Sequence, residues 1–278
     1  MFLVTGANGQ LGSELRLLLG RTAVYVTREE LDITEEAAVR DFFRQQSFDA
    51  VINCAAYTAV DKAEDDRESA DRINRLGPAL LARYGRRLIQ ISTDYVFDGT
   101  AHLPYKEDDV PHPVSVYGST KLAGEQAVLA EADTAVVIRT AWLYSSFGAN
   151  FVKTMRRLGS ERETLGVIFD QIGTPTYAAD LAQAVVDILP QITPGMKAIY
   201  HYSNEGVASW YDFAVAIMEE SALSCTVNPL ETADYPTRAA RPAYSVLNKA
   251  KIKHDFGLTI PHWRDGLRRC IQIMDAHV

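Results

Sequence analysis

The sequence begins with MFLVTGANGQLG (residues 1–12), in which an apolar run is followed by glycines spaced as G-x-x-G-x-x-G. An amphipathic stretch, residues 10–19, comes directly behind them. Gly6, Gly9 and Gly12 let the backbone turn tightly and approach a pyrophosphate, whose charge the free N–H groups at a helix N-terminus stabilise. We therefore predict the strand, glycine turn and helix of a dinucleotide-binding unit, with an ordinary strand-to-helix turn as the alternative.

Strand and helix patterns alternate through the first half of the chain. Apolar runs of strand length lie at Phe2–Thr5, Ala23–Val26, Ala50–Cys54, Leu88–Ser92 and Ala135–Arg139. Amphipathic runs of helix length lie at Leu11–Leu19, Thr34–Gln46, Arg67–Tyr84 and Ser115–Ala130. Such alternation is typical of βαβ units, which build a parallel sheet covered by helices. We expect an α/β fold in which residues 1–145 form a Rossmann-type, doubly wound parallel sheet that binds NAD(P).

The alternation loosens after residue 145. Helices are predicted near Phe151–Leu158, Tyr177–Leu189 and Trp210–Ser221, with short strands at Thr164–Ile168 and Ala198–Tyr202. We expect residues 146–278 to form a smaller α/β lobe that binds substrate. Elements within residues 164–200 are candidates to return to the nucleotide-binding domain.

Composition and charge narrow the classes of partner and compartment. The chain has 36 acidic residues against 28 Lys and Arg, for a net charge of −8, which disfavours nucleic acid and anionic membranes as partners. No apolar stretch reaches the roughly 20 residues that span a bilayer, and the first residues already belong to a predicted strand, so we expect a cytoplasmic protein. Cys54, Cys225 and Cys270 lie far apart and form no metal-ligand cluster, so we expect reduced thiols.

A second motif, YGSTK at residues 117–121, suggests the reaction. Tyr117 and Lys121 lie four residues apart on a predicted helix and therefore share one face. Reduction of a ketone leaves an alkoxide that needs a proton, and an ammonium beside a phenol lowers the phenol's pKa toward neutrality. Thr93, at a strand end, would hydrogen-bond the carbonyl oxygen and orient it. A solvated pair of side chains is the alternative for this spacing.

Further motifs extend along nearly the whole chain: NCAAYTAVDKAE (53–64), STDYVFDG (92–99), RTAWLY (139–144), GANFVKTM (148–155), DQIGTPT (170–176) and ARP (240–242). Together with the glycine turn, Tyr117 and Lys121, they resemble the extended short-chain dehydrogenase/reductase family. The resemblance implies NADPH-dependent reduction of the C4 ketone of dTDP-4-dehydro-β-L-rhamnose to dTDP-L-rhamnose. It also implies that Thr93, Tyr117 and Lys121 are the catalytic residues.

The expected cofactor site combines the glycine turn and Arg28 with further residues that the resemblance implies. Its residues are Gly6, Gly9, Gln10, Leu11, Gly12, Arg28, Asp32, Ile33, Ala55, Ala56, Tyr57, Thr58, Ile91, Tyr117 and Lys121. The resemblance implies that Asp32 and Ile33 flank the adenine. The ammonium of Lys121 can also bind the ribose hydroxyls of the cofactor.

The resemblance implies that five residues contact the sugar nucleotide. They are Thr93, Asp94, Tyr95, Trp142 and Arg241, of which Arg241 suits bidentate contact with a diphosphate. Three of them have a simpler alternative that stays open: Trp142 could pack at a lobe boundary, Arg241 could form a surface ion pair, and Asp94 could cap a turn.

The choice between NADPH and NADH depends on the residues after the second strand. Thr27 and Arg28 stand where an acidic residue would bind the 2′-hydroxyl of NAD, and Arg28 can accept a 2′-phosphate, so we predict NADPH with NADH tolerated. The resemblance also implies magnesium at a homodimer contact. Glu14 fits one ligand position, but residues 177–181 offer alanines and Asp180 where a glutamate is expected, so we assign no metal ligand.

Two other functions remain open at this point. Another sugar-nucleotide 4-ketoreductase, or a 4-epimerase, shares the fold and the catalytic trio, and an epimerase would consume no NADPH. A non-catalytic, NADP-binding regulatory subunit resembles the same family. Net loss of NADPH with the sugar nucleotide separates these three functions.

Overall fold

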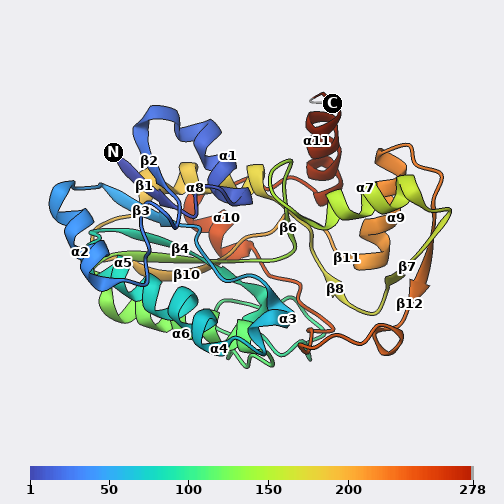
Figure 1. The fold of residues 1–278 in the computed structure, drawn as a ribbon, viewed down its shortest axis with the longest axis horizontal. Coiled ribbons are helices and arrows are strands. Elements are labelled where there is room, and N and C mark those ends of the chain that lie inside the picture. Colours follow the sequence, from blue (N-terminus) through green and yellow to red (C-terminus); the bar gives the residue numbers. More distant parts are fainter. Residues whose placement is uncertain (277–278) are drawn as a thin grey trace.

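A parallel sheet of six strands forms the centre of the computed structural model, which describes residues 1–276 (Figure 1). The strand order is β2-β1-β3-β4-β5-β10. The strands are β1 (Phe2–Thr5), β2 (Ala23–Val26), β3 (Ala50–Asn53), β4 (Leu88–Thr93), β5 (Ala135–Thr140) and β10 (Lys197–His201). The chain leaves β1 toward β2 on one side and then crosses to β3 on the other, so a crevice opens at the carboxyl ends of β1 and β3.

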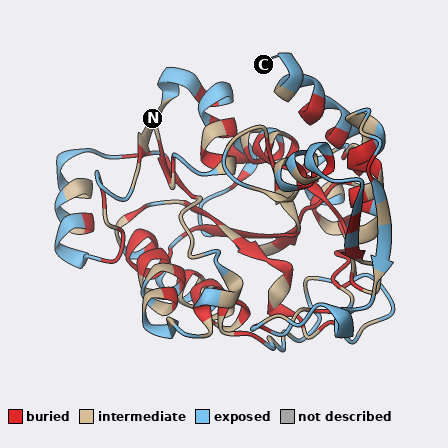
Figure 2. Ribbon diagram, turned by 45° about the vertical axis from the view of Figure 1, so that its right-hand side comes forward, coloured by how far each residue is buried: buried red, intermediate tan, exposed pale blue. Residues whose placement is uncertain are grey.

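Helices cover both faces of the sheet. One face carries α1 (Gln10–Leu19), α8 (Ala178–Ile188) and α10 (Ala250–Phe256), and the other carries α2 (Glu36–Gln45), α5 (Gly77–Tyr84) and α6 (Val116–Glu131). Alternate residues of each strand point to opposite faces, so Val4 packs in the first of these cores and Leu3 in the second. The four inner strands β1, β3, β4 and β5 are buried almost throughout, whereas the edge strands β2 and β10 are only partly buried (Figure 2). This confirms the predicted α/β, doubly wound fold.

Helices and strands from the second half of the chain build a smaller unit beside the sheet, which we call the small lobe. It comprises α7 (Phe151–Glu161), α9 (Trp210–Glu220), α11 (Trp263–Ala276) and the parallel pair β7 (Thr164–Ile168) and β12 (Thr226–Leu230). Between the sheet and the small lobe run the short pairs β6 (Leu143–Tyr144) with β9 (Thr176–Tyr177), and β8 (Ile172–Gly173) with β11 (Ala208–Ser209). In Figure 1 the small lobe lies to the right of the sheet.

The predicted helix at 67–84 is divided into three parts. It consists of α4 (Arg67–Asp71), one π-helical turn at Arg72–Leu76, and α5. Pro78 explains the wide turn, because it lacks the N–H that an α-helix would direct to the carbonyl of Asn74. The predicted strands β1 to β5 agree with the structure to within one residue, whereas α10, α11 and β12 were not predicted.

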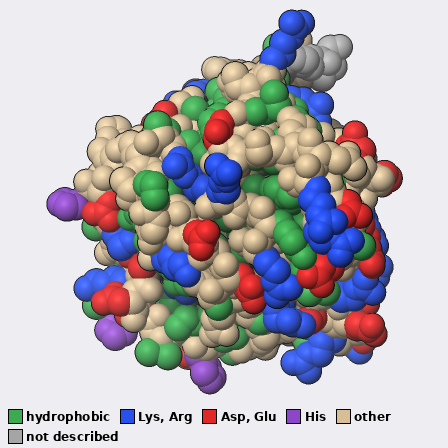
Figure 3. Space-filling view, turned by 90° about the vertical axis from the view of Figure 1, so that its left-hand side faces the viewer, with side chains coloured by type: hydrophobic (Ala, Val, Ile, Leu, Met, Phe, Trp, Pro, Cys, Tyr) green, Lys and Arg blue, Asp and Glu red, His purple; other side chains and the backbone are tan. Residues whose placement is uncertain are grey.

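Charged side chains of both signs lie side by side on the surface. On the face of the molecule at the left of Figure 1, Lys and Arg are interspersed with Asp and Glu (Figure 3). Arg83, for example, pairs with both Glu36 and Glu131. Among the described helices we find none that combines the length and the apolar character needed to cross a bilayer.

Candidate functional site

The glycine turn after β1 leaves room for a ligand at the N-terminus of α1. Gly6 has φ of +65°, and a Cβ there would lie 2.6 Å from the Ala55 nitrogen. A Cβ on Gly12 would lie 2.5 Å from the Gly6 carbonyl oxygen. Gly9 is the N-cap of α1 and offers no side chain to the first N–H groups of the helix. The turn therefore fits a pyrophosphate, which such N–H groups bind.

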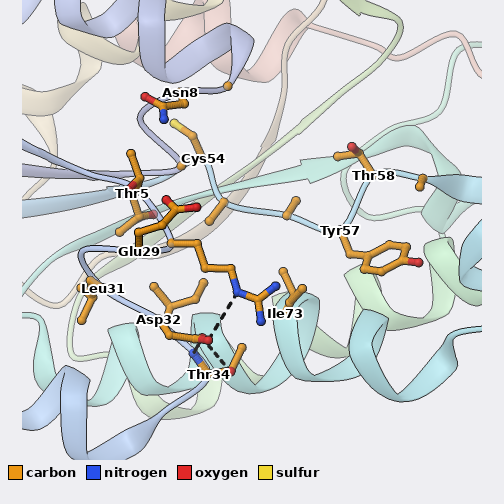
Figure 4. A pocket seen from close by; sticks show the side chains of 18 of the residues that line it. Thr5, Asn8, Glu29, Leu31, Asp32, Thr34, Cys54, Tyr57, Thr58 and Ile73 are labelled. Carbon is orange, nitrogen blue, oxygen red and sulfur yellow. Dashed lines mark hydrogen bonds and ion pairs between the residues drawn. The ribbon is translucent and has the colours of Figure 1, made fainter. Parts of the chain in front are cut away.

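A cavity of about 560 Å³ opens from this turn across the carboxyl ends of β1, β2 and β3 (Figure 4). It is lined by nine of the predicted cofactor residues: Gly6, Gly9, Arg28, Asp32, Ile33, Ala55, Ala56, Tyr57 and Thr58. Sequence reasoning did not assign Asn8, Glu29 or Lys62 to it, although all three line the same cavity. None of these three belongs to a motif that marks it as a ligand-binding residue.

Arg28 and Asp32 meet at the mouth of this first cavity. The Arg28 Nε lies 3.4 Å from the Asp32 Oδ2, and the Arg28 side chain is 73% exposed. The Thr34 N–H and hydroxyl also donate to Asp32 Oδ1, at 2.9 and 2.7 Å (Figure 4). Burial opposes ionisation of Asp32, but the hydrogen bonds from Thr34 and the charge of Arg28 hold its pKa below the usual value. The guanidinium is thus weakly held and accessible to an anion.

A second cavity, of about 540 Å³, adjoins the first and shares Gly9, Cys54, Ala56 and Thr58 with it. It is lined by the remaining predicted residues: Gln10, Leu11, Gly12, Ile91, Thr93, Asp94, Tyr95, Tyr117, Lys121, Trp142 and Arg241. The structure therefore places every predicted site residue on one of two adjoining cavities.

Close packing of α6 brings Tyr117 to the second cavity. Ser115 caps the helix, its Oγ accepting from the Gly118 N–H at 3.1 Å. A Cβ on Gly118 would lie 2.1 Å from the Tyr95 carbonyl oxygen, so only glycine lets α6 approach the turn at Asp94–Val96. The rings of Tyr95 and Tyr117 then meet edge to face, 5.5 Å apart.

The Tyr117 phenol is buried, and its ionisation is suppressed. Burial raises its pKa above the ordinary value, and Asp94 and Tyr95 raise it further, while a hydrogen bond with Thr93 lowers it. The pKa of Tyr117 is therefore raised and not lowered as expected, because burial outweighs the hydrogen bond with Thr93. At neutral pH Tyr117 carries its proton.

Lys121 is 4% exposed and lines the second cavity. Its Nζ donates to the Ile91 carbonyl at 2.6 Å. Burial lowers the pKa of Lys121 to about 8, although Glu125, one turn further along α6, favours the charged form. Lys121 and Tyr117 line the same cavity from one helix, as their four-residue spacing predicts.

Thr93 and Asp94 end β4 inside the cavity. The Thr93 hydroxyl donates to Asp94 Oδ1 at 3.0 Å and accepts from the Tyr95 N–H at 3.2 Å, so Thr93, not Asp94, caps the short turn that follows. Asp94 is 2% exposed, and burial raises its pKa to about 6. A carboxyl group in this state can accept or donate a hydrogen bond near neutral pH.

Trp142 lines the cavity and also packs between the sheet and the small lobe. Its backbone has φ of +47°, which is rare for a bulky residue. Its indole stacks on that of Trp210 with ring centroids 3.6 Å apart, and a Cβ on Gly173 would come within 2.6 Å of it. Sequence reasoning missed Trp210, because an aromatic residue at a helix start is typical of core packing.

Arg241 reaches the cavity from the loop before α10. Its Nη2 lies 2.6 Å from Asp61 Oδ2, and its Nη1 donates to the Tyr95 hydroxyl at 3.2 Å. The ion pair considered as an alternative is therefore present, and it lies at the cavity rather than on an open surface.

The acidic residues considered for a metal have protein partners. The Ser145 hydroxyl donates to Glu14 Oε1 at 2.6 Å, and Asp180 pairs with Arg269 at 2.8 Å. Within residues 1–276 we find no group of three or more His, Cys, Asp or Glu side chains placed to hold a metal ion.

Comparisons with known proteins agree on one family. The family model described as RmlD substrate binding domain matches residues 1–276. The spore coat polysaccharide biosynthesis protein SpsK of Bacillus subtilis is 42% identical, covering 97% of this chain and 96% of its own. The dTDP-4-dehydrorhamnose reductase of Aggregatibacter actinomycetemcomitans is also 42% identical and covers 96% of both chains. The crystal structure of the Bacillus anthracis dTDP-4-dehydrorhamnose reductase in complex with NADP has a TM-score of 0.94 at 38% identity, covering 98% of both chains. This chain therefore belongs to the dTDP-4-dehydrorhamnose reductases, a family of NAD(P)H-dependent oxidoreductases.

Proposed function

We propose that this protein reduces the C4 ketone of dTDP-4-dehydro-β-L-rhamnose to dTDP-L-rhamnose with NADPH. One observation carries the proposal: Thr93, Tyr117 and Lys121 line the same cavity as the glycine turn. Relatives of about the same length carry this activity in their names, and one was solved with NADP.

The first cavity is proposed to hold the adenosine half of the cofactor. Asp32 and Ile33 would flank the adenine, the N–H groups at the start of α1 would bind the pyrophosphate, and Arg28 would bind the 2′-phosphate. NADPH, when bound, supplies the hydride. Because Arg28 already has a carboxylate partner in Asp32, its contribution to the choice of cofactor is modest, and NADH remains a usable substitute.

Two residues of the second cavity, Thr93 and Tyr117, are proposed to have separate roles in the reduction of the ketone. Thr93 would hydrogen-bond the ketone oxygen and hold the carbonyl in place. Tyr117 would donate its proton to the oxygen as negative charge develops there. Its raised pKa suits this direction, because the phenol is fully protonated at neutral pH and an alkoxide is a stronger base than a phenolate.

Lys121 is proposed to have two roles, one toward the cofactor and one toward Tyr117. Its ammonium would bind the ribose hydroxyls of the cofactor and would stabilise the phenolate that Tyr117 becomes after donating its proton. Both effects require the charged form of the lysine, whose pKa of about 8 lies close to physiological pH.

The sugar nucleotide is proposed to lie between the central sheet with its helices and the small lobe. Asp94 and Tyr95 would contact the sugar, Trp142 would pack against it, and Arg241 would bind the diphosphate by exchanging its contact with Asp61. The substrate contacts thus come from both parts of the chain.

The test is a turnover assay with purified protein, NADPH and dTDP-4-dehydrorhamnose. We expect loss of the reduced-nicotinamide absorbance together with formation of dTDP-rhamnose, and no loss without the sugar nucleotide. Tightly bound NAD with interconversion of sugars but no net NADPH loss would indicate an epimerase. Binding of NADPH without turnover would indicate a regulatory subunit, and either result would overturn the proposal.

A further inference from the structure

A fully buried ion pair lies directly behind the proposed catalytic residues. Glu125 of α6 and Arg139 of β5 are each 1% exposed. Arg139 makes a bidentate contact, with Nε 3.0 Å from Glu125 Oε1 and Nη2 2.7 Å from Oε2. The proposed reaction uses neither side chain.

The position of Glu125 connects this pair to the site. It follows Lys121 by four residues on α6, so the two side chains lie on one helix face. The hydroxyl of Ser92, the residue before Thr93, donates to Glu125 Oε1. Arg139 pairs in register with Ser92 across β4 and β5, so the ion pair connects both strands to the helix that carries Lys121.

Stability alone is a poor explanation for this pair. Desolvating two charges costs several kcal/mol per ion. Replacing a buried ion pair by apolar residues of similar volume commonly leaves the free energy of unfolding unchanged or raises it. A buried carboxylate does, however, exert a strong field on a neighbouring charge, because little water screens it. Lys121 is such a neighbour, itself almost fully buried.

We propose that Glu125, held in place by Arg139, is a positioning residue that keeps the Lys121 ammonium charged at the floor of the cleft. Its consequence for turnover rests on the proposed function, whereas its effect on Lys121 does not.

The other groups around Lys121 do not replace Glu125. Cys54, at the end of β3, is a thiol whose pKa burial raises to about 12. Ile91 presents a neutral carbonyl from β4, and Tyr117 is a protonated phenol. Asp94, in the turn after β4, acts on Tyr117. His201 of β10, behind Arg139, stays neutral because burial and Arg139 lower its pKa to about 3.

The sign of the effect follows from burial and from the larger of the two charges that oppose it, Glu125 ahead of Cys54. Burial lowers the pKa of Lys121 and the carboxylate of Glu125 raises it. Without Glu125 the pKa falls, so Lys121 loses its charge at a lower pH. The alkaline limb of the pH–activity profile then moves to lower pH.

The experiment follows Lys121 directly, by NMR titration of the full chain with ¹³Cε-labelled lysine. Lys121→Met identifies the signal by its loss. The test variant, Glu125→Gln with Arg139→Met, removes both charges and leaves no unpaired buried ion. We expect the Lys121 midpoint to fall by about one pH unit or more. Asp180→Asn with Arg269→Met, which removes an ion pair between α8 and α11, should leave the midpoint unchanged.

Turnover gives a second measurement. Above both midpoints, a fall of one pH unit reduces the protonated fraction of Lys121 about tenfold, so kcat at alkaline pH should fall by about the same factor. Activity at pH 6 should change far less. Glu125→Asp keeps the negative charge, so its Lys121 midpoint should lie closer to that of the wild type than the midpoint of the double variant does.

The outcomes separate this inference from the proposed function. A Lys121 midpoint that stays within about 0.3 pH units of the wild type in the double variant overturns the inference, even in an active enzyme. A shifted midpoint in the double variant, together with a wild-type protein that does not turn over the sugar nucleotide, supports the inference and overturns the proposed function. Glu125→Gln alone is measured in the same way if the double variant does not fold.

Discussion

At the scale of single residues, we expect removal of the Tyr117 hydroxyl to lower kcat more than any other single change in the site. Tyr117→Phe keeps the ring packed against Tyr95 and removes only the proton donor. Because the proton moves in the transition state, kcat should fall about 10²- to 10⁴-fold while KM changes less than about twofold. Steady-state kinetics with NADPH and the sugar nucleotide measure both.

A tyrosine outside the cavity provides the control for this substitution. The Tyr84 hydroxyl donates to Glu36 on the exposed surface, and Tyr84→Phe should leave kcat at the wild-type value. A raised KM with an unchanged kcat in Tyr117→Phe would instead assign Tyr117 to ground-state binding.

The single residues divide into those that a local pattern could reveal and those that it could not. Tyr117 and Lys121 share one helix, so their spacing alone predicts that they meet. Glu125 and Arg139 meet only because α6 packs on β5, and no local pattern marks such a contact. The direction of the Tyr117 pKa was mispredicted for the same reason, since burial is a property of the whole fold.

At the scale of elements, the first turn of α1 depends on Gly12. Gly12→Ala would place a methyl group 2.5 Å from the Gly6 carbonyl oxygen, so the helix must move away from β1. We expect a loss of about 1–3 kcal/mol in the free energy of unfolding, as for other overpacked sites. The Kd for NADPH should rise at least about tenfold, measured by fluorescence titration.

The next residue of α1 offers a comparison within the same helix. Ser13→Ala places the same new residue type on α1 without entering the glycine turn, so NADPH should bind as in the wild type. Equal affinity in Gly12→Ala and Ser13→Ala would show that the close approach of α1 to the turn is unimportant for the cofactor.

The elements themselves were predictable wherever a strong pattern lay in one short stretch. The strands β1 to β5 are continuous apolar runs, and their predicted bounds differ from the structure by at most one residue. α10 escaped prediction because it is seven residues long and buries only Ile252 and Phe256. α11 does carry a regular apolar stripe, formed by Trp263, Leu267, Cys270 and Ile271, so the sequence held a helical signal that was overlooked.

At the scale of the whole molecule, stability should depend on pH through His201. This histidine is completely buried in β10, and its pKa of about 3 lies far below the unfolded value. Between these values the unfolded chain binds the proton and the folded chain does not, so the stabilisation is present above about pH 6.5 and is lost as the pH falls. From pH 7 to pH 5, His201 alone should lower the free energy of unfolding by about 2 kcal/mol.

Denaturant unfolding of His201→Gln across this range measures the contribution. The variant should show a free energy of unfolding that changes by about 2 kcal/mol less between pH 7 and pH 5 than in the wild type. His112→Gln, at an exposed site, should keep the wild-type slope. Parallel pH profiles for the wild type and His201→Gln would contradict the prediction.

The path of the chain has a consequence for its synthesis. After β5 the chain passes into the small lobe with α7, returns to the sheet with α8 and β10, leaves again with α9, returns with α10, and ends in α11. One edge of β5 is covered only by β10, so a nascent chain that has not yet reached residue 201 carries an open row of backbone donors and acceptors. Such an edge pairs readily with other chains, so a gene fragment cut at codon 145 should yield an aggregating product rather than a working nucleotide-binding module.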